Sequence, residues 1–176
     1  MSKCIKGGVL GAIILFIWSF VSWMVLPWHE NSIHTFKDET AISQIIQSNA
    51  SVSGIYFSPS YKAADANTPP PQGPTVFAAV HLEGAQGSMT MPMVISFLTY
   101  LVAAFLVAWM LSKMNGSSYF QRVMFVVVFA LAAGVVTDVP YWNWFKFDMN
   151  YTLIMMADLL VGWFLAGLVM AKVCKK

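Results

Sequence analysis

Residues 153–165 read Leu153-Ile154-Met155-Met156-Ala157-Asp158-Leu159-Leu160-Val161-Gly162-Trp163-Phe164-Leu165. This run is apolar on both sides of a single carboxyl group, that of Asp158. About 20 such residues in a helix can cross the hydrocarbon core of a membrane, which is about 30 Å thick. A carboxyl group placed there costs roughly 2.5 to 3.5 kcal/mol, so it should face other helices or a water-filled cavity. The stretch therefore predicts a membrane helix that carries a candidate functional residue.

Composition extends this prediction to the whole chain. Of its 176 residues, 58% are hydrophobic and 10% are charged, whereas a soluble domain carries about 25% charged residues. Apolar runs long enough to span a membrane cover about residues 8–27, 92–112, 122–140 and 151–172. We therefore expect an all-α transmembrane fold, a compact four-helix membrane bundle in which the first span stays uncleaved.

Charge is distributed unequally around these four predicted spans. One side carries basic residues and no acidic ones, namely Lys3, Lys6, Lys113, Arg122, Lys172, Lys175 and Lys176. The positive-inside rule makes that side cytoplasmic, so both termini are inside and the loop between the first two spans is outside. The net charge of +2 is thus a signal of topology, and we infer no nucleic-acid binding from it.

Residues 28–91 should form a small α+β cap outside the membrane, between the first and second spans. Asp38 is a suitable N-cap for a short helix, one face of which collects Ala41, Ile42, Ile45 and Ile46. Residues 54–57 and 75–82 read as two strands. A helix with a two-stranded ribbon is too small to be stable alone, so we expect the cap to pack onto the outer ends of the bundle.

Two further segments of the outer side have a characteristic composition. Pro69-Pro70-Pro71 lies between the two predicted strands and favours an extended path. Residues 140–148 form a short aromatic loop, Pro-Tyr-Trp-Asn-Trp-Phe-Lys-Phe-Asp. Because Trp and Tyr prefer the headgroup level, we expect this loop to lie along the membrane surface.

Small residues recur four positions apart within three of the spans. The pairs are Gly7 with Gly11, Ala104 with Ala108, and Gly162 with Ala166. Such pairs let helix backbones approach closely. They predict either contacts inside one bundle or contacts between copies in a homo-oligomer.

The four spans bring polar side chains to a similar depth near the outer interface. The candidate ligand-binding residues are Ser22, His29, Tyr100, Asp138 and Asp158. One interpretation is a structural hydrogen-bonded cluster, in which Asp158 is protonated or bonds to Tyr100, Ser22 or a tryptophan indole. The other is a pocket for a lipid headgroup, a quinone or another amphipathic ligand, with His29 at its mouth as a proton carrier.

A metal site is a third hypothesis. Methionine thioethers suit Cu(I), and the candidate ligands are His81, Met89, Met91 and Met93. His29 and His34 are five positions apart and follow Pro27, so they do not match the zinc signature with histidines four apart on a helix. All three histidines lie outside the spans and no cysteine pair lies near the outer face, which argues against a haem buried between helices and against a disulfide-forming oxidoreductase.

Four stretches together resemble a group of uncharacterised bacterial inner-membrane proteins with four spans and one periplasmic loop. These stretches are Leu26-Pro27-Trp28-His29, Ser53-Gly54-Ile55-Tyr56-Phe57, Tyr141-Trp142-Asn143-Trp144-Phe145, and residues 158–167, Asp-Leu-Leu-Val-Gly-Trp-Phe-Leu-Ala-Gly. The resemblance implies this topology and a bacterial cytoplasmic membrane, and it carries no catalytic residues or cofactor.

Without a motif for a reaction, the leading hypothesis is a non-enzymatic accessory or scaffold subunit of a membrane assembly. It would contact membrane lipids and either a protein partner or further copies of itself. The first alternative is ligand binding, with or without catalysis, around Asp158. The second is extracytoplasmic copper handling by the segment 89–93.

Overall fold

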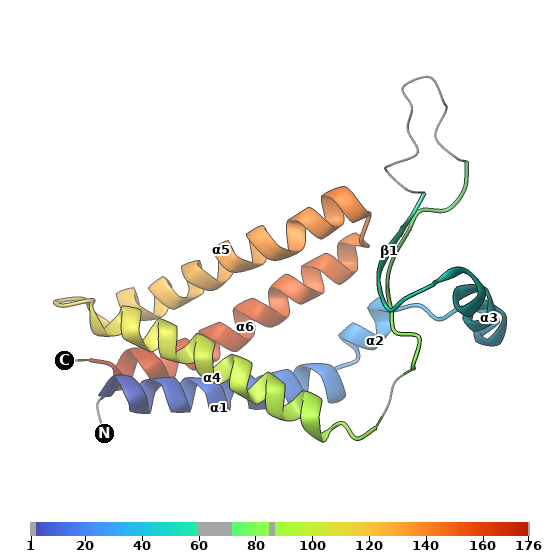
Figure 1. Ribbon diagram of the computed structural model, residues 1–176. Coiled ribbons are helices and arrows are strands. Elements are labelled where there is room, and N and C mark those ends of the chain that lie inside the picture. The colour runs from blue at the N-terminus through green and yellow to red at the C-terminus, as the bar shows by residue number, and fades with distance from the viewer. Residues whose placement is uncertain (1–2, 60–71, 85–86, 176) are drawn as a thin grey trace.

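The computed structural model describes residues 3–59, 72–84 and 87–175. Its elements, in chain order, are α1 (Lys3–Met24), α2 (Trp28–Ser32), α3 (Glu39–Asn49), β1 (Gly54–Ser58), β2 (Val76–Val80), α4 (Thr90–Ser112), α5 (Tyr119–Phe145) and α6 (Met149–Val173). Figure 1 shows the four long helices lying side by side, with both ends of the chain at one end and the β ribbon at the other. We call these the terminal end and the ribbon end.

Within the described residues, four helices are long and apolar enough to cross a membrane, and they are α1, α4, α5 and α6. They correspond to the four spans predicted from hydropathy. α1 ends at Met24, three residues earlier than predicted. Pro27 explains that end, because a proline disfavours helical conformation in the residue before it. The chain then forms the short helix α2, which the sequence pattern did not indicate.

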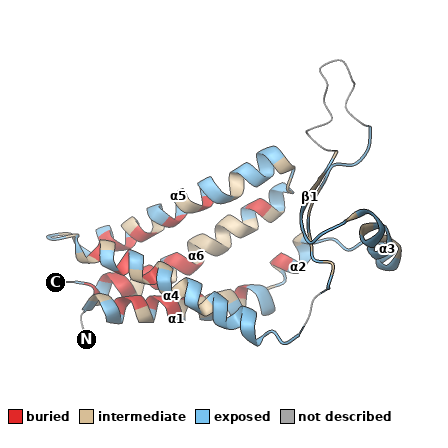
Figure 2. Cartoon of the chain, in the orientation of Figure 1, coloured by how far each residue is buried: buried red, intermediate tan, exposed pale blue. Residues whose placement is uncertain are grey.

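The four long helices are packed in the order α4, α1, α6, α5. α1 contacts both α4 and α6, and α5 contacts α6, whereas α4 and α5 are not among the closely packed pairs of described elements. The core lies in the terminal half (Figure 2), where Leu111, Val126, Ala166 and Met170 are fully buried. Towards the ribbon end the helices spread apart, so the predicted bundle is closely packed only in its terminal half.

Small residues account for the close packing of the terminal half. All three predicted pairs, Gly7 with Gly11, Ala104 with Ala108 and Gly162 with Ala166, are buried inside the single chain. The prediction of contacts within one bundle is confirmed for these pairs. Contacts between copies through other surfaces stay a prediction.

The aromatic segment 140–148 is mostly helical, and its prediction as a surface loop was wrong. α5 continues through Pro140 to Phe145. Proline removes one backbone hydrogen bond of a helix, but the helix continues because the rings that follow are packed against the ribbon. The C-cap of α5 is Lys146, which has a left-handed conformation (φ 60°). Its N–H donates a hydrogen bond to the Tyr141 carbonyl. Asp148 then caps the start of α6.

The β ribbon contacts the end of α5 nearest to it through its aromatic residues. β1 and β2 are antiparallel and pair Phe57 with Phe77. The ring of Phe77 lies 4.4 Å from that of Phe145 and 5.9 Å from that of Phe147, centre to centre. The expected contact between cap and bundle is therefore present for the ribbon. The segment Pro69-Pro70-Pro71 lies outside the described residues.

α3 is placed away from the four long helices, beyond the ribbon (Figure 1). Asp38 caps it as predicted, because its side chain accepts a hydrogen bond from the Ala41 N–H at 2.9 Å. None of the described side chains of α3 is buried, and Ile45 is 57% exposed. Ile42 and Ile46 are half-buried, so the described residues cover only part of the apolar face that was expected to need a cover.

Candidate functional site

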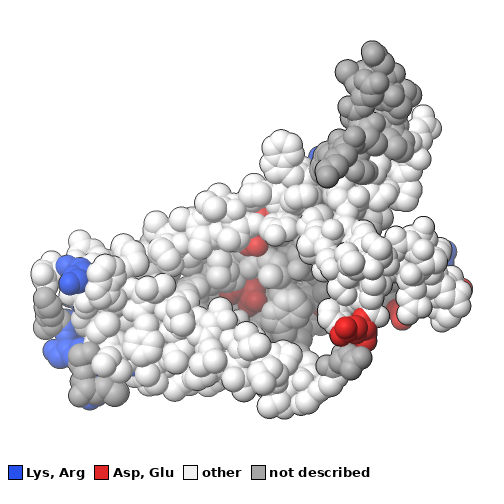
Figure 3. Space-filling view, in the orientation of Figure 1, with Lys and Arg blue, Asp and Glu red and all other residues white. Residues whose placement is uncertain are grey.

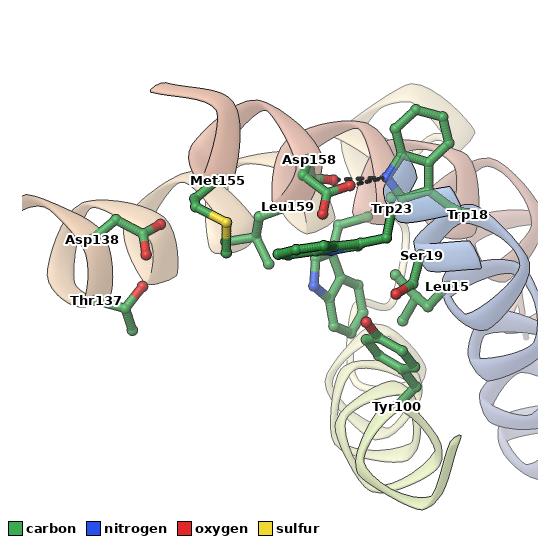
Figure 4. Close-up of a pocket in the computed structure, with 12 residues that line it drawn as sticks. Leu15, Trp18, Ser19, Trp23, Tyr100, Thr137, Asp138, Met155, Asp158 and Leu159 are labelled. Atoms are coloured by element: carbon green, nitrogen blue, oxygen red, sulfur yellow. Dashed lines mark hydrogen bonds between the residues drawn. The ribbon is translucent and has the colours of Figure 1, made fainter. Parts of the chain in front are cut away.

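Asp158 is fixed in place by an indole from the neighbouring helix. Trp18 of α1 donates its Nε1–H to the Asp158 carboxyl oxygen Oδ1 at 2.6 Å and to the backbone oxygen of Asp158 at 3.0 Å (Figure 4). The Asp158 side chain is 15% exposed. Hydrogen bonds to a charged acceptor are the strong ones in proteins, worth about 1.5–3 kcal/mol. This pair therefore ties α1 to α6 in the less tightly packed half of the molecule.

Gly162 makes room for that bond. A Cβ atom at Gly162 would lie 2.8 Å from Cδ1 of Trp18 and 3.4 Å from Cδ2 of Leu15. Gly162 is one helical turn beyond Asp158, so the Trp18 ring rests on the glycine while its nitrogen reaches the carboxyl group. A larger residue at 162 would push the indole away from Asp158.

His29 approaches Asp158 from the ribbon end. Pro27 turns the chain out of α1, and α2 returns His29 to the inside, where its side chain is 2% exposed. Its Nε2 lies 3.0 Å from Ser22 Oγ and 3.6 Å from Asp158 Oδ2. The imidazole stacks on Trp23 with ring centres 3.9 Å apart and planes 9° apart. Trp28 meets its edge and also donates to Ser22 Oγ at 3.1 Å.

The same nitrogen of His29 faces both Ser22 and Asp158, while Nδ1 is buried with no hydrogen-bond partner among the described residues. In a serine hydrolase triad the carboxylate holds one ring nitrogen and the serine contacts the other. Ser22, His29 and Asp158 therefore lack triad geometry. They form a polar cluster that holds a neutral histidine against a carboxyl group.

Burial lowers the pKa of His29, because the charged imidazolium is disfavoured away from water, and the nearby Asp158 carboxyl offsets this only in part. The unfolded chain then binds a proton at His29 more readily than the folded chain does. The result is a loss of stability as the pH falls from 6.5, the ordinary pKa of histidine, towards the lowered folded pKa. Well above 6.5 this contribution is constant.

We expect His29→Gln, which does not titrate, to flatten the fall in thermal stability between about pH 5 and 8. The measurement is the unfolding midpoint of the detergent-solubilised protein at each pH. His34→Gln is the matched control, since His34 is exposed, and it should keep the wild-type slope. Equal slopes for wild type and His29→Gln would show that His29 does not contribute.

A cavity of about 220 Å³ lies beside Asp158 and is lined by all four long helices. Its polar lining comes from Trp18 and Ser19 of α1, Tyr100 of α4, Thr137 and Asp138 of α5, and Asp158 of α6. Figure 4 shows Asp138 and Asp158 on different walls, with Tyr100 reaching in from α4. In Figure 3 acidic residues, coloured red, lie within a hollow between the terminal end and the ribbon end. The cavity exists because the helices spread apart at this level.

Two further hollows adjoin this cavity. One of about 200 Å³ lies between α5 and α6 and shares Asp138 and Met155 with it. The other, of about 450 Å³, is an apolar groove along α1 and α4 that includes Phe16, Phe20 and Met93. The groove shares Ser19, Trp23 and Tyr100 with the cavity, so these three side chains border both spaces.

The structure brings together three of the five residues proposed from sequence, namely Ser22, His29 and Asp158. His29 is not at the mouth, as proposed, but is buried against Asp158. Asp138 and Tyr100 line the cavity from other helices. The prediction that a tryptophan indole could bond to Asp158 is confirmed by Trp18, but the sequence did not indicate which tryptophan it would be, nor the roles of Trp23 and Trp28. The available signal was the spacing of Trp18 and Ser22, four residues apart and therefore on one face of α1.

The proposed copper ligands are not gathered at this site. His81 is exposed and its Nδ1 lies 3.1 Å from the Gly84 backbone oxygen. Met89 and Met93 line the apolar groove, whereas Met91 is not part of its lining and is 65% exposed. In the described part of the chain no group of three or more His, Cys, Asp or Glu residues could hold a metal ion. Copper handling stays a prediction.

In comparisons with known proteins, no protein-family model, no curated protein and no solved structure matches this chain. The resemblance inferred from sequence therefore stays a prediction, and the site has to be interpreted from its own geometry.

Proposed function

We propose that the chain is a multi-pass protein of the bacterial inner membrane, with its terminal end in the cytoplasm and the β ribbon outside. Lysine and arginine side chains gather at the terminal end in Figure 3, which is the distribution that the positive-inside rule describes. Asp158 is nine residues from the first residue of α6, about 14 Å along the helix axis. In this orientation the cavity lies in the outer half of the membrane.

We propose that the protein binds an amphipathic ligand there, with the polar part of a lipid, a quinone or a similar molecule in the cavity beside Asp158. The observation that carries this proposal is the cavity itself, lined by all four long helices and bordered by an apolar groove that shares three of its lining residues. Ligand sites combine apolar walls with a few placed polar groups, and helix-lined cavities with intramembrane carboxyl groups are typical of function. Because the Ser22–His29–Asp158 cluster lacks triad geometry, binding is favoured over acyl transfer.

The test is a variant that closes the junction between cavity and groove. Ser19 lines both, so Ser19→Phe should remove the bound molecule. Ile17→Phe adds the same ring on the same helix at a side chain that is 56% exposed, and it should keep the ligand. Each protein is extracted from its native membrane in mild detergent without overexpression, and native mass spectrometry records every mass that remains bound.

Loss of a small adduct from Ser19→Phe alone would support ligand binding at this site. An adduct retained by both variants would place the ligand elsewhere and overturn the proposal. A stoichiometric protein partner on both variants, with no small adduct, would instead favour the accessory or scaffold role. The observation in favour of that role is the uncovered apolar residues outside the four long helices, Ile33, Phe36, Ile45, Val52 and Ile55, each at least half exposed.

A further inference from the structure

The charge of the cavity lining indicates the charge of the ligand. Two acidic residues, Asp138 and Asp158, line the cavity, and its described lining includes no lysine or arginine. His29 behind Asp158 is held towards the neutral form by burial, which lowers its pKa. A buried carboxylate is costly unless it is paired with an opposite charge. The lining therefore favours a cationic group and disfavours an anionic one.

Aromatic side chains in the walls favour the same charge. The cavity around the two carboxyl groups is lined by four aromatic residues, Trp18, Trp23, Trp163 and Tyr100. The face of an aromatic ring attracts an ammonium group, by about 0.5–1 kcal/mol at exposed sites and about 2 when water is excluded. Combined with a carboxylate, such rings form the kind of site that recognises amines and quaternary ammonium ions.

The volumes of the cavity and the groove suit a ligand with two parts, a head group and a hydrocarbon chain. At about 220 Å³ the cavity is smaller than the roughly 300–1,000 Å³ of pockets that enclose a whole drug-sized ligand, so it suits a head group. The groove of about 450 Å³ along α1 and α4 is lined mainly by apolar side chains and borders the cavity at Ser19, Trp23 and Tyr100. A ligand with its head group in the cavity could therefore place its hydrocarbon chain in the groove, past these three residues.

We propose that the ligand is a long-chain ammonium amphipath, with its amine or quaternary ammonium head beside Asp158 and its chain in the groove between α1 and α4. This inference rests on the proposed function and specifies the charge of the ligand. The ammonium group belongs either to a simple cationic amphipath or to a zwitterionic lipid, and the two share the same recognition by carboxylate and aromatic rings.

The experiment compares four probes with the same chain length: dodecyltrimethylammonium, dodecylphosphocholine, dodecanol and dodecanoate. Binding is followed by the tryptophan fluorescence of the full chain in dodecyl maltoside micelles, which carry no charge. We expect dodecyltrimethylammonium to bind about tenfold more tightly than dodecanol, the effect of one charge-assisted contact. Asp158→Asn should remove most of that difference.

Glu30→Gln is the matched control, since it removes an exposed carboxyl group that does not line the cavity, and it should keep the preference. Asp138→Asn should reduce the preference in part. If dodecylphosphocholine equals the simple cation, the source is a zwitterionic lipid; if it binds as weakly as dodecanol, the source is a simple amine. Equal binding of all four probes, abolished by Ser19→Phe, would overturn the cationic inference while preserving the proposed function. Binding of none would overturn both.

Discussion

Replacing Phe77 with alanine is expected to release the β ribbon from the helices. Phe77 is the central ring of the ribbon contact, with Tyr141 at 6.1 Å, Phe145 at 4.4 Å and Phe147 at 5.9 Å between ring centres. Truncating a packed phenylalanine costs about 3–5 kcal/mol in a core, and we expect about 3 kcal/mol here because Phe77 is half-buried. Two strands alone are too small to remain ordered without this support.

Hydrogen exchange measures the release directly. The backbone amides that pair β1 with β2 should exchange about 100-fold faster in Phe77→Ala, the equivalent of about 3 kcal/mol. Val76→Ala is the control on the same strand, because the Val76 side chain is 45% exposed. Unchanged exchange in Phe77→Ala would mean that the ribbon is held by contacts other than this aromatic cluster.

Replacing Gly11 with leucine is expected to separate α1 from α6. A Cβ at Gly11 would lie 2.5 Å from Sδ and 3.0 Å from Cγ of Met170, and 3.4 Å from Cβ of Ala104. The Met170 side chain is flexible, but it is fully buried, so moving it aside would disturb its packed neighbours. Overpacking of this kind costs about 1–3 kcal/mol, and the better helix propensity of leucine returns less than about 1 kcal/mol of that.

The expected net effect is a loss of about 2 kcal/mol in the free energy of unfolding, measured by titration with a denaturing detergent. Ile13→Phe adds bulk to the same helix at a side chain that is 39% exposed, and it should be close to neutral. A Gly11→Leu protein as stable as wild type would contradict the close contact of α1 with α6 at this level.

Hydropathy was sufficient to predict the four long helices, because crossing length and apolar composition are properties of a single segment. The Asp38 cap was also predictable, since it depends only on residues three or four positions apart. The continuation of α5 beyond Pro140 was not. It depends on Tyr141 and Phe145 packing against Phe77, which is far away in sequence, and this tertiary contact outweighs the proline signal.

The sequence predicted which polar side chains lie at a similar level along the four helices. It did not predict which of them contact one another. Counting residues from the outer end of each span grouped Ser22, Tyr100, Asp138 and Asp158, and all but Ser22 are part of the cavity lining. A tryptophan partner for Asp158 was predicted, but its identity as Trp18 was not, because the rotation of α1 about its own axis is set by packing on Gly162 and cannot be deduced from hydropathy. The burial of His29 was missed because it depends on the direction in which α2 leaves Pro27.

The packing order of the long helices divides the molecule into two pairs, α1 with α4 and α5 with α6, that meet along the boundary between α1 and α6. At the terminal end this boundary is a tight contact between glycine and methionine, and farther along it is crossed by the hydrogen bond from Trp18 to Asp158. Any opening of one pair relative to the other, hinged at the terminal end, must therefore stretch that bond. A molecule that competes for the Asp158 carboxyl group would weaken the hydrogen bond that connects the two helix pairs.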